Sequence, residues 1–149
     1  MEKGRVFVVI VSACLAGVAC RYDGESCPDE EVISLVETRK ALPVCPEQLG
    51  GLPTPREPAE IRGGDGGDVL RGKAIVLDRR GRDVSSDFVK GASEVLRLAK
   101  LVGATEAIVK AESPSCGCGS ISQGGRLVPG DGVTVSLLKQ HGISIRVKQ

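Results

Sequence analysis

The chain has 149 residues, 20 basic and 19 acidic side chains, and a formal net charge of +1. The balanced charge argues against the basic surface of a nucleic-acid-binding module. The chain has no Trp, one Tyr and two Phe, which is too few for the aromatic platforms on which bases stack. Beyond the N-terminus no apolar run approaches the roughly 20 residues of a membrane helix, so we expect a soluble, cytoplasmic chain that forms a single domain over residues 1–149.

The opening segment, VFVVIVSACLAGVAC, has two incompatible interpretations. Lys3 and Arg5 before an apolar run resemble an export or lipoprotein signal. The β-branched and aromatic residues of Arg5–Val11 instead predict a buried strand followed by a loop that carries cysteines. Gly17 occupies the place where a lipoprotein signal needs an aliphatic residue before Cys20, which favours the strand.

A helix and a second strand follow. Acidic residues after Ser26 or Pro28 and basic residues near Lys40 are typical of the two ends of a helix. Ala41–Val44 is then predicted to be a short strand.

The next segment, Pro46–Gly67, has four prolines and six glycines and is predicted to lack regular structure. Long ordered loops inside compact domains are usually functional. Gly72–Val84 is predicted to form a small hairpin, with strands Lys73–Leu77 and Asp83–Val84.

The C-terminal half alternates helices and strands. We expect a helix capped by Ser85 or Ser86 and ended at Val102 before Gly103, a strand Ala107–Ala111, a helix Gly132–Gln140 before Gly142, and a strand Ile143–Val147. Strands alternating with crossover helices predict an α/β fold, Rossmann-like, with a mostly parallel sheet and a small β-hairpin insert.

Three of the six cysteines lie in the segments that follow predicted strands: Cys14, Cys45 and Cys116. In a parallel sheet the carboxyl ends of the strands lie at one edge, where open α/β folds place their ligands. We therefore expect these three thiols to converge, whereas Cys20 and Cys27 taken singly are more often small core residues.

Several chemistries could use converging thiols. Structural zinc usually needs four nitrogen or sulfur ligands, often from close cysteine pairs, and the chain has one histidine, His141. A disulfide network suits secreted proteins rather than a cytosolic α/β domain. Soft thiolates also suit an iron–sulfur cluster, and three protein ligands to a four-iron cluster would leave one iron open to a substrate atom.

Four sequence blocks, SACLAGVACRYDG, PVCPEQLGGLPTPREPAEI, GGDGGDVLRGKA and KAESPSCGCG, resemble the signatures of the thiouracil desulfidase family. The resemblance runs from about Ser12 to Gly142. It implies a 4Fe-4S cluster held by Cys14 (SAC), Cys45 (PVC) and Cys116 (SPSC), whose open iron takes the sulfur of a thiocarbonyl. Water then replaces that sulfur without redox change and hydrogen sulfide is released.

The resemblance also implies catalytic roles for Glu47, in CPEQ, and Ser113, the first residue of SPSC. A carboxylate beside the cluster can act as general base toward the attacking water. A hydroxyl from Ser113 or Ser115 can orient the water or the substrate ring.

Further polar residues lie in the same loops. Arg21, Asp23, Thr54 and Arg56 can contact a pyrimidine edge or a nucleotide phosphate, although surface ion pairing is nearly as good an account of the two arginines. The chain departs from the family pattern at Cys118 and in GSISQGGRLVPG, which has no aromatic residue where one is expected. Free base, nucleoside and nucleotide all stay open as substrates.

Two alternatives to a desulfidase remain. The first is a non-catalytic iron–sulfur protein that serves as a sensor or sulfur store. The second is thiol redox or persulfide transfer through Cys116 and Cys118. The expected partner is a small thiolated pyrimidine, with no membrane or nucleic acid.

Overall fold

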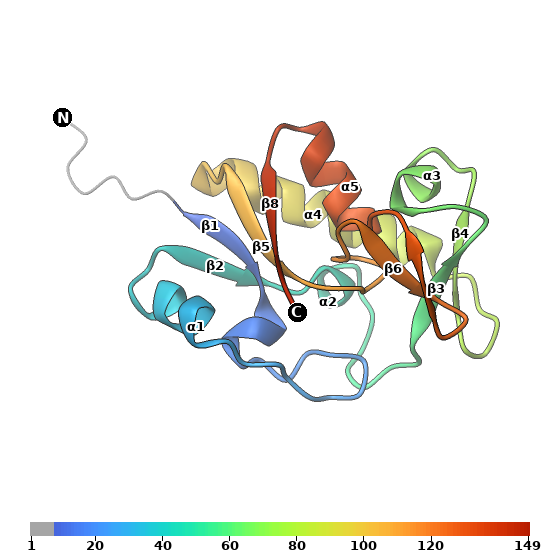
Figure 1. The fold of residues 1–149 in the computed structure, drawn as a ribbon, viewed down its shortest axis with the longest axis horizontal. Helices are drawn as coiled ribbons and strands as arrows, with labels where there is room; N and C mark the ends of the chain where they lie inside the picture. The colour runs from blue at the N-terminus through green and yellow to red at the C-terminus, as the bar shows by residue number, and fades with distance from the viewer. Residues whose placement is uncertain (1–7) are drawn as a thin grey trace.

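The computed structural model describes residues 8–149. Lys3, Arg5 and the beginning of the predicted strand Arg5–Val11 lie outside the described residues. The central sheet has four parallel strands in the order β2-β1-β5-β8 (Figure 1). Its strands are β1 (Val9–Ser12), β2 (Ala41–Val44), β5 (Glu106–Lys110) and β8 (Ser144–Lys148).

The two faces of the sheet are covered by different helices. Ile10 packs in the cluster that contains residues of α4 (Ser85–Val102) and α5 (Val133–Gln140). The next residue, Val11, packs in the cluster that contains Val32 of α1 (Glu30–Glu37). Figure 1 shows α4 and α5 together on one side of the sheet and α1 apart from them. Burial on both faces explains the continuously apolar strands, and the predicted mostly parallel α/β class is confirmed.

The helices begin and end at recognisable signals. Asp29 caps α1 by accepting the N–H of Val32, so the helix begins later than predicted. It also ends earlier than predicted, at Glu37. The end predicted for α4, at Val102, is confirmed, and Gly103, with φ 69°, ends the helix. Its cap is not a serine, because Ser85 lies inside the helix and its hydroxyl accepts the N–H of Val76.

The prediction that Pro46–Gly67 lacks regular structure is wrong. It contains α2 (Pro46–Leu49), β3 (Ala59–Arg62) and the beginning of α3 (Gly66–Leu70). Pro46 occupies the first turn of α2, where its missing N–H costs no hydrogen bond.

The predicted hairpin has a different partner strand. β4 (Ile75–Asp78) pairs antiparallel with β3, and the predicted second strand contributes one bridge, between Leu77 and Asp83. A further hairpin that was not predicted consists of β6 (Ser120–Gln123) and β7 (Arg126–Pro129).

The hairpin of β6 and β7 lies beside β3. Its two-residue turn, Gly124–Gly125, has φ values of 56° and 76°, the conformation that favours glycine in tight hairpins. The N–H of Gly124 donates to Glu60 Oε2 at 2.6 Å, which links this hairpin to β3. Among residues 8–149, no helix combines the length and apolarity that crossing a membrane requires.

Candidate metal centre

Four cysteines line one cavity of about 640 Å³ at the carboxyl edge of the sheet: Cys14, Cys45 and Cys116, which follow strands, and also Cys20. Cys14 lies in a short 3-10 helix, Ala13–Ala16, directly after β1. Cys45 follows β2 and precedes the first turn of α2, and Cys116 lies in the turn after β5. The structure therefore brings together the thiols that strand order predicted to converge.

Local hydrogen bonds fix these loops. The Ser12 hydroxyl accepts the N–H of Lys110 at 3.0 Å, which joins the ends of β1 and β5. The Ser113 hydroxyl accepts the N–H of Cys116 at 2.7 Å, closing the turn that presents this cysteine. Gly17, with φ 92°, ends the helix that carries Cys14.

The thiols differ in electrostatics. Burial is the main cause that raises the pKa of Cys14 and that of Cys116. Interaction with the Cys20 thiol lowers the pKa of Cys45 to about 6, helped by the N–H of Gln48. Cys45 Sγ also lies 3.7 Å from the carbonyl oxygen of Cys20.

The donor set fits an iron–sulfur cluster better than a single ion. Within residues 8–149, no three His, Cys, Asp or Glu side chains gather closely enough to hold one metal ion. Cys14, Cys20, Cys45 and Cys116 instead border one cavity. Soft sulfur donors distributed in this way suit a cluster that is larger than one ion.

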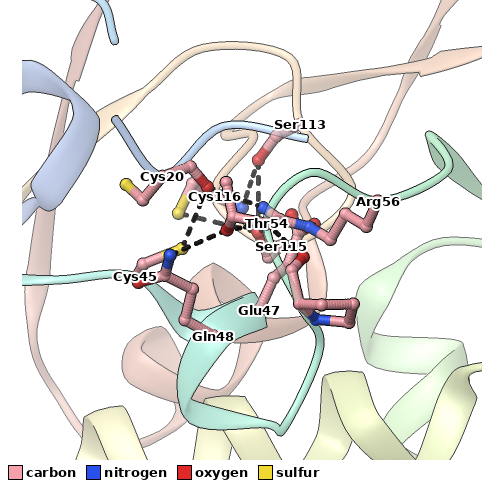
Figure 2. Close-up of polar contacts among 10 residues, drawn as sticks. Cys20, Cys45, Glu47, Gln48, Thr54, Arg56, Ser113, Ser115 and Cys116 are labelled. Carbon is pink, nitrogen blue, oxygen red and sulfur yellow. Dashed lines mark hydrogen bonds and ion pairs between the residues drawn. The ribbon is translucent and has the colours of Figure 1, made fainter. Parts of the chain in front are cut away.

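Glu47, Ser113 and Ser115 meet beside these cysteines (Figure 2). Ser115 is 2% exposed and donates to Glu47 Oε2 at 3.0 Å. Its Oγ lies 3.4 Å from Ser113 Oγ and 3.8 Å from Cys116 Sγ. The arrangement connects the Glu47 carboxylate through the Ser115 hydroxyl to the Cys116 thiol.

Arg56 and Thr54 are engaged by the protein itself. The Arg56 side chain is 7% exposed and donates from Nε to Glu47 Oε1 at 2.8 Å. Thr54 Oγ1 accepts from Arg56 Nη1 at 2.9 Å and from Gln48 Nε2 at 2.8 Å. Arg56 lines the cavity and Thr54 does not border it.

Arg21 and Asp23 differ in their position relative to the cavity. Arg21 lines the cavity, and its guanidinium lies 6.0 Å from the centre of the Tyr22 ring. Asp23 is exposed and accepts the N–H of Glu25 at 3.0 Å, and it is not part of the cavity wall.

Sequence reasoning missed several lining residues. Lys110 ends β5 and Glu112 follows it at the same sheet edge, so their position at the end of a core strand was an available signal. Arg79, Arg126 and Leu127 come from the two small hairpins, and nothing local in the sequence indicates where those hairpins dock.

Comparisons with known proteins identify the family of the chain and a similar solved structure. The family model for 2-thiouracil desulfurase matches residues 9–149. The uncharacterized protein YbbK of Bacillus subtilis (strain 168) is 46% identical over 141 residues, covering 93% of each chain. The solved structure of the [4Fe-4S]-dependent thiouracil desulfidase TudS matches with a TM-score of 0.84 and 40% identity, over 95% of this chain and 91% of that one. The chain belongs to the 2-thiouracil desulfurase family.

Proposed function

We propose that the protein removes sulfur from thiolated uracil, or from its nucleoside or nucleotide, at a 4Fe-4S cluster held by Cys14, Cys45 and Cys116. One observation carries the proposal: the three thiols and the Glu47–Ser115 pair line the same cavity. Similarity to a [4Fe-4S]-dependent desulfidase supports it. Water supplies the oxygen of the product and both of its protons leave with the sulfur as hydrogen sulfide, so no electrons are exchanged.

When bound, the cluster would supply Lewis-acid polarisation of the thiocarbonyl through an iron without a protein ligand. Glu47 takes the proton of the attacking water at Oε2, the oxygen that faces Ser115. The Ser115 hydroxyl lies within hydrogen-bond distance of Glu47 Oε2 and passes that proton toward the departing sulfur. General acid–base catalysis of this kind contributes about 10²- to 10⁴-fold in rate.

The charge of the cavity favours a substrate with an anionic group. Arg21, Arg79 and Arg126 line it, and none of the three pairs with a carboxylate within residues 8–149. Guanidinium groups bind phosphate through paired hydrogen bonds. A thiolated uridine monophosphate therefore fits the cavity better than the free base.

Anaerobic reconstitution followed by iron and acid-labile sulfide analysis tests the proposal. We expect about four irons per chain and sulfide release from 4-thiouracil and 4-thiouridine monophosphate, with the lower KM for the nucleotide. An intact cluster that releases no sulfide from any thiolated pyrimidine would instead identify a non-catalytic iron–sulfur protein. Absence of iron after reconstitution would favour thiol chemistry.

A further inference from the structure

Arg56 connects three separate segments of the chain beside the cavity. Its guanidinium donates to the side chain of Glu47, to the segment Pro53–Thr54 and to the loop that carries Cys20 (Figure 2). The individual distances are 2.8 Å from Nε to Glu47 Oε1, 3.2 Å from Nη1 to the Pro53 carbonyl, 2.9 Å from Nη1 to Thr54 Oγ1, and 2.9 Å from Nη2 to the Cys20 carbonyl. A side chain that is 7% exposed and has these partners has little left to offer a ligand.

The first of these contacts determines how the Glu47 carboxylate is turned. The terminal torsion of a glutamate is soft, so an isolated carboxylate samples a broad range of orientations. Arg56 Nε holds Oε1, and Ser115 Oγ donates to Oε2 at 3.0 Å. The two oxygens are thereby distinguished, and Oε2 is directed toward the serines beside Cys116.

The other contacts hold the loop between β1 and α1 against Glu47. Arg56 Nη2 donates to the Cys20 carbonyl, and its backbone N–H donates to the Tyr22 carbonyl at 2.8 Å. The 3-10 helix that carries Cys14 opens this loop, so Arg56 ties the segment that presents one thiol to the carboxylate. Glu47 and Arg56 also border a second cavity of about 670 Å³, so the ion pair lies where the two cavities meet.

We propose that Arg56 is a positioning residue that orients the Glu47 carboxylate for proton transfer and does not bind the substrate. The inference rests on the proposed desulfidase function. A fixed guanidinium plane is needed, because a lysine ammonium at this position can carry the charge but cannot hold several partners in one geometry.

Kinetics of Arg56→Lys and Arg56→Ala distinguish positioning from substrate binding. We expect kcat to fall about 10²-fold, the cost of misplacing a reacting group by about 1 Å, with KM unchanged for 4-thiouracil and for 4-thiouridine monophosphate. Guanidinium ion, added far below denaturing concentration, should restore part of kcat in Arg56→Ala. Arg97→Ala, on the exposed face of α4, is the matched control and should behave as wild type.

A rise in KM confined to the nucleotide, with kcat intact, would identify Arg56 as a phosphate contact and overturn the proposal.

A double-mutant cycle on thermal unfolding, combining Arg56→Lys with Glu47→Gln, gives a readout that needs no activity. The two changes should be non-additive, whereas Arg97→Ala and Glu47→Gln should add. Additivity of the first pair overturns the inference, and this cycle remains informative where the wild-type protein releases no sulfide and the proposed function itself fails.

Discussion

The neighbours of Glu47 hold its carboxylate, in the first turn of a short helix, beside the cavity thiols. α2 begins immediately after Cys45, so Glu47 lies two residues from a cavity thiol. The side chain is 15% exposed, and its two oxygens meet different donors, Arg56 and Ser115. The carboxylate thus stays near the thiols with one oxygen directed at a hydroxyl.

Glu47→Gln keeps the size of the side chain and an acceptor for Arg56 but removes the proton acceptor. We expect kcat for sulfide release to fall by about 10²- to 10⁴-fold, the usual contribution of a general base. The iron content should equal that of the wild-type protein, because Glu47 is not among the proposed ligands. Full activity at full iron content would contradict the assignment.

The two serines should fail in different ways. Ser115→Ala removes the donor to Glu47 Oε2, and we expect kcat to fall about 10- to 100-fold, equivalent to about 1.5–3 kcal/mol for a hydrogen bond to a charged group. Ser113→Ala removes the acceptor of the Cys116 N–H and should instead lower iron retention. Iron analysis beside initial rates separates the two effects, and equal iron loss in both variants would refute the distinction.

Residue types in the loops were predictable, but their partners were not. The cysteines could be placed because each follows a strand, and strand ends share an edge. Arg56 could equally have faced a ligand. No local pattern distinguishes a guanidinium that binds a ligand from one that is bonded to the Cys20 carbonyl. That contact joins residues 36 positions apart and exists only in the folded chain.

At the scale of elements, helices and strands marked by local signals were predicted correctly. A strand that depends on pairing with a distant segment was not. β2 matches the predicted Ala41–Val44, and α4 ends at Val102 as predicted, because Gly103 marks that end locally. β3 is hidden among prolines and glycines and becomes a strand by pairing with β4, across the intervening α3. Tertiary pairing here outweighs the propensity of a turn-rich sequence.

The contact between α2 and α4 depends on two glycines at which the facing backbone leaves no room for a side chain. A Cβ on Gly91 would lie 1.9 Å from the carbonyl oxygen of Pro46, and one on Gly50 would lie 2.0 Å from that of Asp87. These glycines bring the helix that carries Glu47 directly against the backbone of α4.

Gly91→Ala should therefore push α2 away from α4 and disturb the cavity. Alanine in a helix interior normally stabilises by about 1 kcal/mol relative to glycine. Overpacking typically costs about 1–3 kcal/mol, and a contact of 1.9 Å to rigid backbone makes the steric cost dominant. Urea unfolding should show reduced stability and sulfide release should fall, while Ser93→Ala, at an exposed position of α4, should leave both unchanged.

Across the whole molecule, the strand order explains why the site can be assembled from distant segments. β2, β1 and β5 are neighbours in the sheet, and the loops after them carry Cys45, Cys14 and Cys116. The fourth strand, β8, supplies no cavity residue and instead pairs with the other side of β5. Its charged side chains face the start of α1, which covers the sheet face opposite α4.

This last contact makes stability depend on pH in a defined direction. Glu31 of α1 pairs with Lys148 at 2.8 Å and also with Arg146, and Lys148 Nζ lies 3.4 Å from a second carboxylate, that of Asp29. Lys148 first, and then Arg146, lower the pKa of Glu31 from its ordinary value of 4.5 to about 2. Because the folded-state pKa is the lower one, the stabilisation is complete above the unfolded pKa and is lost as the pH falls toward 2.

Comparing wild type with Glu31→Gln isolates this contribution. The difference in unfolding free energy should be constant above about pH 5.5, where the carboxyl of the unfolded chain is ionised, and should shrink steadily from there toward pH 2. Added salt should reduce it at every pH, since the pair is exposed and open to screening. Denaturant titrations across this pH range make the measurement, with Glu37→Gln at the exposed end of α1 as control. A difference that grew on acidification would show that Glu31 is not held ionised by β8.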